Sequence, residues 1–208
     1  MKKIILIIIY TFFWRNFLRI FIGLKYFNNK SLKNIKQFIL VANHNSHMDT
    51  MAIMSAIPSR FIHRVHPIAA RDFFGNNFIQ KFLMRYSVNA TLIRRDREDP
   101  NRDPINDMNK MLQKQRSLIL FPEGSRGIPG IMSNFKTGLG YLVQKNPSID
   151  VIPVYLDDVY KTLPKGKKLI LPYNCSITFG KPIDFKSYEM EDILETAEKE
   201  ILKLKNRN

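Results

Sequence analysis

The sequence predicts one α/β domain, in which a central mixed β-sheet is flanked by helices, preceded by a separate N-terminal helical segment. The chain has 208 residues, a length that suits a single domain. Hydrophobic residues make up 45% of it and aromatic residues 12%, which is enough for a packed core and excludes a wholly disordered chain. After residue 30, short apolar runs alternate with helical patterns, as in α/β domains. We therefore place the α/β domain at residues 31–208 and the N-terminal helical segment at residues 1–30.

Six short runs of apolar residues are predicted as strands. They are Gln37–Ala42, Pro67–Ala70, Ala90–Ile93, Leu118–Phe121, Val151–Leu156 and Ser176–Phe179. Apolar residues at helical spacing predict helices over residues 76–86, 104–112, 135–143 and 193–204, and a further helix is expected from near Ser46 through Ile57. In open α/β sheets the loops after the strands carry the functional residues, so we look for chemistry there.

The N-terminal 48 residues contain eight Lys and Arg residues and no carboxylate. Ile4–Trp14 is apolar apart from Thr11, and Arg15, Arg19 and Lys25 follow it at intervals of four and six residues. This pattern predicts an amphipathic, membrane-associating helix that lies in the bilayer interface, with the three cations facing anionic headgroups. A spanning helix needs about 20 apolar residues, so this short apolar stretch argues against a span. A cleaved signal peptide and an ordinary core helix are the alternatives.

The net charge of +15 predicts anionic partners. Phospholipid, nucleic acid and phosphorylated small molecules all remain open on charge alone. The single cysteine, Cys175, cannot form an internal disulfide and fits a reducing, cytoplasmic environment. No Cys and His cluster has the spacing of a zinc site, and His63 and His66 have no carboxylate beside them, so no metal site is predicted.

Polar side chains follow the strand Gln37–Ala42, in the segment from Asn43 to Asp49. If a helix begins near Ser46, the Asp49 carboxylate can fold back toward the imidazole of His44. Such a pair forms a general base, because the carboxylate fixes the tautomer while the other ring nitrogen takes a proton from a hydroxyl. The alternative is structural: Ser46 and Asp49 also match a capping box, which satisfies the first N–H groups of a helix. His47 is expected to be a bystander or a support for His44.

The loop after Leu118–Phe121 has an unusual composition, Phe121-Pro-Glu-Gly-Ser-Arg-Gly127. Its glycines let the backbone approach a ligand, Glu123 can accept from a substrate hydroxyl, and Arg126 can hold a phosphate through two hydrogen bonds. A tight turn with a solvated Glu and Arg pair is the alternative.

Two more strands carry notable residues. Arg94 and Arg95 follow directly after the strand that ends at Ile93. Pro153 interrupts the apolar run Val151–Val154, and because proline has no N–H, this position is predicted at a sheet edge or at the end of a hydrogen-bonded ladder.

These four elements, in this order and spacing, resemble the glycerolipid acyltransferases, the family that contains lysophosphatidic acid and glycerol-3-phosphate acyltransferases. The resemblance covers roughly residues 35–185. Asn43, His44 and Asp49 match the family's Asn-His-x4-Asp motif, and the loop from Phe121 to Arg126 matches Phe-Pro-Glu-Gly-Thr/Ser-Arg. The family's second motif commonly ends in Phe-Ile-Asp-Arg; this chain keeps Arg95 and has Arg94 in place of the Asp. The apolar stretch Val151–Val154 matches the fourth motif.

The resemblance implies transfer of a fatty acyl group from a thioester, either acyl-CoA or acyl-carrier protein, to the free hydroxyl of a lysophospholipid. The expected acceptor is 1-acyl-sn-glycerol-3-phosphate and the expected product is phosphatidate. His44, oriented by Asp49, would be the catalytic base. The implied substrate-binding residues are Asn43, Arg95, Glu123, Gly124, Ser125 and Arg126. N–H groups near Gly124 or Gly127 are candidate donors to the oxyanion.

The resemblance further implies no metal and no cofactor beyond the acyl donor. It implies a position on the cytoplasmic face of the inner or plasma membrane, against anionic lipids. Arg71 stands where the family often has a basic residue, so it is a candidate contact to the donor or a solvated charge.

Other functions remain as alternatives. The acceptor can be glycerol 3-phosphate or another lysolipid. A basic nucleic-acid-binding or membrane-binding protein without catalysis would explain the charge, but the chain has no nucleic-acid recognition motif or concentrated Lys/Arg tract, so no nucleic-acid partner is expected. A hydrolase that uses His44 and Asp49 would need a serine nucleophile, and the chain has no Gly-x-Ser-x-Gly motif.

Overall fold

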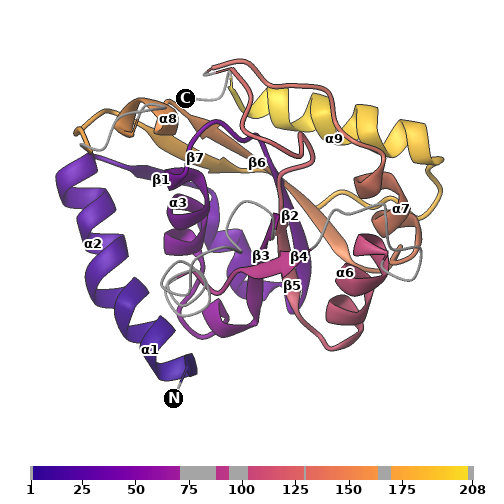
Figure 1. Ribbon diagram of the computed structural model, residues 1–208, viewed down its shortest axis with the longest axis horizontal. Helices are drawn as coiled ribbons and strands as arrows, with labels where there is room; N and C mark the ends of the chain where they lie inside the picture. Colours follow the sequence, from indigo (N-terminus) through magenta and orange to yellow (C-terminus); the bar gives the residue numbers. More distant parts are fainter. Residues whose placement is uncertain (1, 71–87, 94–102, 129, 164–169, 206–208) are drawn as a thin grey trace.

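A seven-stranded mixed β-sheet lies between two layers of helices (Figure 1). The structure is a computed structural model that describes residues 2–70, 88–93, 103–128, 130–163 and 170–205. Within these residues the strand order is β1-β7-β6-β2-β5-β3-β4, and neighbouring strands are parallel except for the antiparallel pair β6 and β7. The predicted fold class, an α/β domain with a central mixed sheet flanked by helices, is confirmed.

The strands are short, as the apolar runs predict. They are β1 (Lys25–Phe27), β2 (Phe38–Ala42), β3 (Val65–Ala70), β4 (Thr91–Ile93), β5 (Ser117–Leu120), β6 (Asp150–Asp157) and β7 (Ser176–Phe179). The α-helices of the domain are α3 (Met48–Ala56), α6 (Pro104–Gln113), α7 (Gly138–Gln144), α8 (Val159–Thr162) and α9 (Met190–Lys205). Short 3-10 helices cover Asn29–Asn34 and Ile62–Arg64.

Strand β2 is buried on both faces because it lies in the middle of the sheet. Phe38, Leu40 and Ala42 belong to the core that includes α3 and the N-terminal helix. Ile39 and Val41 belong to the second core, which includes α6, α7 and α9. All five residues are at most 1% exposed. An uninterrupted apolar run is the pattern expected of a parallel strand covered on both faces.

All six strands predicted from the sequence are present, with ends that differ by no more than two residues. The sequence did not indicate β1, because its side chains are exposed or half-buried at the edge beside β7 and form no apolar run. The helices α3, α6 and α9 lie where they are expected, whereas α7 begins at Gly138, after Phe135. The helix expected over residues 76–86 lies outside the described residues.

Pro153 lies inside the sheet, so the prediction of an edge position is wrong. Strand β6 pairs with β2 on one side, where Pro153 is opposite Val41, and with β7 on the other. The β6–β7 ladder begins at Val154, opposite Phe179, and the N–H of Gly180 donates to the Pro153 carbonyl at 2.8 Å. The N–H and C=O of one strand residue face the same side, so the missing N–H faces the end of this ladder. The other predicted position, at the end of a ladder, is confirmed.

The N-terminal segment forms one continuous helix over Lys2–Ile22, in which α1 (Lys2–Ile8) and α2 (Arg15–Phe17) alternate with π-helical turns at Ile9–Trp14 and Leu18–Ile22. It runs along one side of the molecule next to α3 (Figure 1). One face packs on the domain through Leu6, Tyr10, Leu18 and Ile22, each at most 4% exposed. The outer face exposes large apolar side chains: Ile4, Ile5, Ile8, Phe12, Phe13, Ile20 and Phe21. The helix therefore contributes to the core and also presents an apolar surface.

By length and composition this helix is able to cross a membrane, and it is the one such helix in the part of the chain that the structure describes. The helix is longer than the apolar stretch Ile4–Trp14, whose short length argued against a span, because it continues to Ile22. Its inner face and the strand β1 that follows it are built into the domain. Residues 1–30 thus pack against residues 31–208 in the structure.

Arg15 faces the domain and not a membrane, which corrects the prediction that it meets headgroups. Its Nε donates to the carbonyl of Ser55 at 2.9 Å and its Nη2 to the carbonyl of Ile57 at 2.8 Å. These carbonyls lie at the C-terminal end of α3, where a helix leaves its last acceptors without intrahelical partners. Arg19 and Lys25 are exposed.

The stability of the fold is predicted to depend on pH through His66 in β3. Burial, followed by the charges of Arg116 and Lys2, lowers the pKa of His66 from 6.5 to about 4. A histidine whose pKa is lowered by folding contributes stability above its unfolded pKa and loses it as the pH falls toward the folded pKa. We expect the wild-type protein to lose about 2–3 kcal/mol more than His66→Gln between pH 6.5 and 4. Urea denaturation of both proteins across this range checks it; parallel pH profiles would contradict it.

Candidate functional site

Three neighbouring strands end at the candidate site. Strand β2 lies between β5 and β6 and is parallel to both. The segment after β2 carries His44, and the segment after β5 carries Glu123. The carboxyl ends of adjacent parallel strands meet at the same edge of a sheet, so the fold brings together residues 79 positions apart in the chain.

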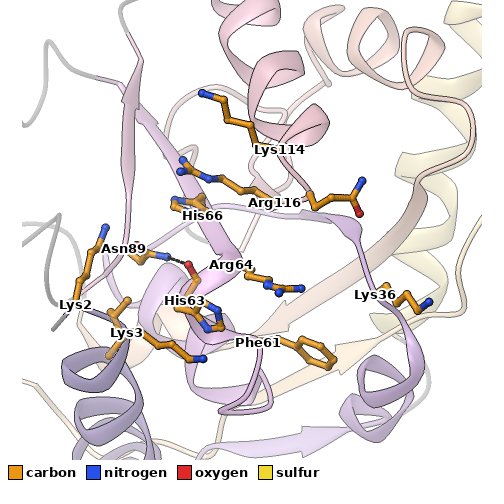
Figure 2. A pocket seen from close by; sticks show the side chains of 12 residues that line it. Lys2, Lys3, Lys36, Phe61, His63, Arg64, His66, Asn89, Lys114 and Arg116 are labelled. Atoms are coloured by element: carbon orange, nitrogen blue, oxygen red, sulfur yellow. Dashed lines mark hydrogen bonds between the residues drawn. The ribbon is translucent and has the colours of Figure 1, made fainter.

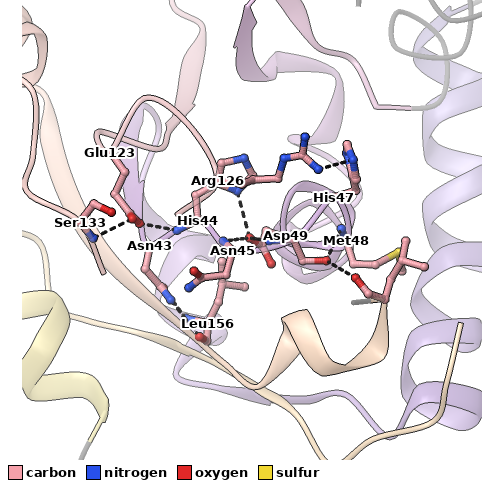
Figure 3. Close-up of polar contacts among 12 residues, drawn as sticks. Asn43, His44, Asn45, His47, Met48, Asp49, Glu123, Arg126, Ser133 and Leu156 are labelled. Atoms are coloured by element: carbon pink, nitrogen blue, oxygen red, sulfur yellow. Dashed lines mark hydrogen bonds and ion pairs between the residues drawn. The ribbon is translucent and has the colours of Figure 1, made fainter. Parts of the chain in front are cut away.

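His44 and Asp49 form the central pair of the site. The Nδ1 atom of His44 lies 3.0 Å from Oδ2 of Asp49. The same oxygen accepts hydrogen bonds from the backbone N–H groups of Asn45 and Ser46, each at 2.7 Å (Figure 3). Since this carboxylate oxygen is an acceptor, Nδ1 carries the proton and Nε2 keeps its lone pair. The side chain of Asp49 is 1% exposed and that of His44 is 18% exposed. The imidazole of His44 is therefore held by a buried carboxylate and remains partly accessible to solvent.

Asp49 makes the contacts that both interpretations require. Its bond from the Ser46 N–H is half of a capping box at the start of α3, and Ser46 Oγ accepts from the N–H of Met48 at 3.1 Å. The bond to His44 is the contact that would orient this imidazole if it acts as a general base. The helix cap and the orientation of His44 therefore depend on one oxygen atom.

Glu123 supports the backbone around His44. Its Oε1 accepts from the His44 N–H at 2.6 Å and its Oε2 from the Ser133 N–H at 2.8 Å (Figure 3). The residue is 3% exposed, and burial raises the pKa of its carboxyl, against the lowering effect of these two donors. These contacts make Glu123 a positioning residue that joins the two loops. A contact between Glu123 and substrate stays a prediction.

Asn43 is also held by the backbone. Its Nδ2 donates to the Leu156 carbonyl at 3.0 Å and its Oδ1 accepts from the Leu156 N–H at 2.8 Å. The side chain thus continues the pairing of β2 with β6 beyond Ala42, where the main chain turns away toward His44. Asn43 is 4% exposed, so its direct role is to hold the end of β2.

The backbone of the second loop is held close to His44. Gly124 has a φ of +77°, a left-handed conformation that favours glycine, and its N–H donates to the Phe121 carbonyl at 3.0 Å. The Gly127 N–H donates to the His44 carbonyl at 3.3 Å, and a Cβ atom there would come within 2.9 Å of Ser133 Oγ. The N–H groups of Gly124 and Gly127 themselves are therefore engaged within the site, and an oxyanion donor elsewhere near them stays a prediction.

Arg126 lies at the open side of the site with His47. The Nη1 atom of Arg126 contacts Nε2 of His47 (Figure 3). Burial, and then the charges of Arg126 and His44, lower the pKa of His47, so its neutral ring can accept this bond. His47 is thus a support for Arg126, a role that the sequence did not indicate. Ser125 is exposed in the same loop.

Phe121 connects the base to an apolar cavity. Its ring stacks on the His44 imidazole, with centroids 4.1 Å apart and planes inclined by 21°. Phe121 also lines a cavity of about 250 Å³ between the ends of β3, β4 and β5 and the starts of α6 and α7. Lys136 lies at this cavity, and its side chain covers Gly124.

Three of the basic residues singled out in the sequence, Arg71, Arg94 and Arg95, lie outside the described residues. Among the residues that the structure describes, no group of three or more His, Cys, Asp or Glu side chains is placed to hold a metal ion. The described site thus consists of a histidine base, its buried carboxylate, an arginine and an apolar cavity.

A family model described as Acyltransferase matches residues 23–157, which is more than half of the chain and includes both segments of the site, Asn43–Asp49 and Phe121–Gly127. The chain belongs to this acyltransferase family. Two curated relatives are named 1-acyl-sn-glycerol-3-phosphate acyltransferase. The alpha form from Mus musculus is 25% identical over 170 residues, covering 77% of this chain and 55% of the relative. The enzyme from Streptococcus pneumoniae (strain ATCC BAA-255 / R6) is 29% identical over 162 residues, covering 76% and 55%.

The chain spans about half the length of the curated relatives it matches. Among solved structures, the fold is similar to that of the 1-acyl-sn-glycerophosphate (LPA) acyltransferase PlsC from Thermotoga maritima. The TM-score is 0.72 at 22% identity, and the match covers 88% of this chain and 71% of the other. This likeness shows the fold.

The roles of three residues were not indicated by the sequence. They are the stacking of Phe121 on His44, the contact of His47 with Arg126, and the position of Lys136 over Gly124. Phe121 and His47 lie inside the motifs, but their partners are distant in the chain. Lys136 lies outside every motif, and no local signal marks it.

Removal of the Glu123 carboxylate is predicted to destabilise the protein. Glu123→Ala leaves the N–H groups of His44 and Ser133 without their acceptor in a buried place. We expect the free energy of unfolding to fall by about 2–4 kcal/mol. The exposed Glu195 on α9 is the matched control, and Glu195→Ala is expected to change it by less than about 0.5 kcal/mol. Urea denaturation measures both; equal stabilities for the two variants would show that Glu123 has no such role.

Proposed function

We propose that this protein transfers a fatty acyl group from a thioester to the free hydroxyl of 1-acyl-sn-glycerol-3-phosphate, giving phosphatidate. The observation that carries the proposal is the contact of His44 Nδ1 with Asp49 Oδ2 at 3.0 Å, in a chain of the acyltransferase family. The names of the relatives support the choice of acceptor. Glycerol 3-phosphate and other lysolipids are the alternative acceptors.

In the proposed reaction, Nε2 of His44 takes the proton of the acceptor hydroxyl as its oxygen attacks the thioester carbonyl. Asp49 stabilises the imidazolium that forms, through the Nδ1 contact. The tetrahedral intermediate collapses, the carbon–sulfur bond breaks, and the thiolate takes the proton from His44. The ester oxygen comes from the acceptor and the thiol is the second product, so the balance needs no oxidant, metal or further cofactor.

The charged and apolar parts of the site suit the two ends of such substrates. Arg126 beside His47 and Lys136 over Gly124 place two cations at the loop Phe121–Gly127, where a phosphate would be attracted. Arg95 is proposed as a further phosphate contact, as the family resemblance implies. The cavity next to Phe121 is lined mostly by apolar side chains, which suits part of an acyl chain.

The acyl donor is proposed to be acyl-CoA or acyl-carrier protein. Both are cytoplasmic thioesters with phosphate or acidic groups, which suit a chain with a net charge of +15. The buried, free Cys175 is compatible with that compartment. We therefore propose that the protein works on the cytoplasmic face of a membrane, and no nucleic-acid partner is proposed.

The role of His44 is tested by one variant and a substrate panel. His44→Ala is expected to lower acyl transfer by about 10²–10⁴-fold, because it removes the general base. Product mass is measured with glycerol 3-phosphate, lysophosphatidate and other lysolipids, each crossed with both donor types. Circular dichroism shows whether the variant is folded. Full activity of a folded His44→Ala protein would overturn the assignment, and labelling of the wild type by a serine-reactive fluorophosphonate would contradict direct attack.

The outer face of the N-terminal helix is proposed to lie in the membrane interface. Phe12 is 70% exposed and Ile20 is 74% exposed, and neither side chain contributes to the packed inner face of the helix. We expect Phe12→Ser/Ile20→Ser to weaken binding to vesicles tenfold or more, since each buried apolar side chain contributes about 1.5–3 kcal/mol. Tyr141→Ser/Leu202→Ser is the control, because these exposed residues lie on α7 and α9, which are on the other side of the sheet from the N-terminal helix. Equal binding by the two double variants in a sedimentation assay would rule out this face.

A further inference from the structure

A second cavity, of about 570 Å³, lies at the opposite end of the sheet from His44. It is bordered by the start of α1, the segment before β2, the amino end of β3 and the turn before β5 (Figure 2). Its lining residues are Lys2, Lys3, Leu6, Lys36, Phe61, His63, Arg64, His66, Asn89, Lys114, Gln115 and Arg116. We call it the basic pocket. It shares no residue with the candidate active site.

The basic pocket is strongly cationic. Six of its lining residues are Lys or Arg, and no Asp or Glu is among the described residues that line it. They come from four separate segments of the chain, and Figure 2 shows the side chains of Lys2 and Lys3 across the pocket from Lys114 and Arg116. Like charges gathered around one cavity repel each other, and an anion placed among them removes that repulsion.

The backbone that carries two of these cations is held in place. Gln115 has a φ of +57°, and the N–H of Arg116 donates to the Met111 carbonyl at 3.2 Å. The Nε2 atom of Gln37 donates to the carbonyls of Leu112 and Arg116, at 2.7 and 3.0 Å. Lys114 and Arg116 are exposed on this turn. Because the backbone of the turn is held by these hydrogen bonds, the backbone positions of both residues are set without a ligand.

The other wall of the pocket contains polar atoms without partners. The Nδ1 of His63 and the Oδ1 of Asn89 are buried and have no hydrogen-bond partner in the described part of the chain. The Nδ2 of Asn89 is engaged by the Val65 carbonyl at 2.8 Å. Burial, and then the charges of Lys3 and Arg64, lower the pKa of His63. Polar groups buried without partners are uncommon in folded proteins and often mark a site that is completed by another group. The His63 Nδ1 can donate to a phosphate in the tautomer that carries its proton, whereas the Asn89 Oδ1 only accepts and would pair with a donor of the headgroup and not with its phosphate.

The position of the pocket beside the N-terminal helix favours a lipid headgroup over a soluble anion. Lys2 and Lys3 begin the helix whose outer face exposes Ile4, Ile5 and Ile8 directly after them. If that face lies in a membrane interface, the mouth of the pocket is at the level of the lipid headgroups. Arg15 cannot supply this contact, because it is bound to the end of α3.

We propose that the basic pocket binds the phosphate-bearing headgroup of an acidic membrane phospholipid, at a site separate from the active centre. The phosphate lies between the cations of α1 and those of the turn before β5, and the lipid tails lie beside the apolar face of the helix. This proposal rests on the proposed membrane association but not on the proposed acyl transfer.

The test compares two charge-matched double variants of the full chain. Arg64→Gln/Lys114→Gln removes one cation from each side of the basic pocket, and both side chains are exposed and hold no structural contact among the described residues. Lys145→Gln/Lys199→Gln removes the same charge from exposed positions near α7 and on α9. Sedimentation is measured with vesicles of phosphatidylcholine, with and without added phosphatidylglycerol.

We expect the pocket variant to bind acidic vesicles about 30-fold more weakly than the wild type and the control, since two cations near an anionic surface contribute about 2 kcal/mol together and about 1.4 kcal/mol is a factor of ten. Its binding to neutral vesicles is expected to stay at the wild-type level. Equal losses in the two double variants, or no loss in the pocket variant, would overturn the proposal. Loss of binding to both kinds of vesicle is instead the signature of the apolar-face variant Phe12→Ser/Ile20→Ser, so the two proposals fail separately.

A second measurement distinguishes lipid from a soluble anion. Inorganic phosphate is titrated into the wild type and the pocket variant without vesicles, and binding is followed by calorimetry. We expect that the basic pocket binds no inorganic phosphate saturably, so the wild type and the pocket variant give the same calorimetric result. Saturable phosphate binding that is lost in the pocket variant, with unchanged vesicle binding, would assign the pocket to a soluble phosphate compound and overturn the lipid assignment.

Discussion

The organisation of the site depends on Oδ2 of Asp49. This one atom accepts from the His44 imidazole and from the backbone N–H groups of Asn45 and Ser46. Without these donors, a carboxylate that is 1% exposed would be very costly to bury. Without the carboxylate, the loop after β2 would leave two N–H groups unpaired at the start of α3. The same contacts therefore stabilise the fold and orient the base, so structural and catalytic interpretations of Asp49 are not in competition.

Other buried polar side chains around the site also bond to backbone groups. Asn43 replaces a backbone partner for Leu156 where β2 ends, and Glu123 joins the backbones of His44 and Ser133. With these polar groups satisfied internally, the His44 ring and the Arg126 guanidinium are left to face outward. A base held by satisfied neighbours keeps one geometry, and this is what proton transfer in a proposed acyl transfer requires.

The fold separates two kinds of chemistry by the direction of its strands. The carboxyl ends of β2 and β5 carry the candidate active site, and the amino ends of β3 and β5 carry the basic pocket. The N-terminal helix lies alongside both core and pocket, with an inner face that is packed and an outer face that is apolar. The net charge of +15 is thus partly concentrated at one end of the sheet, where the helix begins.

Local patterns in the sequence determined six of the described strands, most helices and the identity of the candidate catalytic residues, because apolar runs, helical spacing and the short motif from Asn43 to Asp49 act over a few positions. Only the tertiary structure decided the roles of residues whose partners are far away in the chain. Arg15 bonds to carbonyls 40 and 42 positions away, Glu123 to an N–H 79 away and Asn43 to a residue 113 away. The edge strand β1 and the interior position of Pro153 depend in the same way on which strands become neighbours. A hydrogen bond needs its two atoms within about 3 Å, and that distance is set by the fold and not by the order of residues.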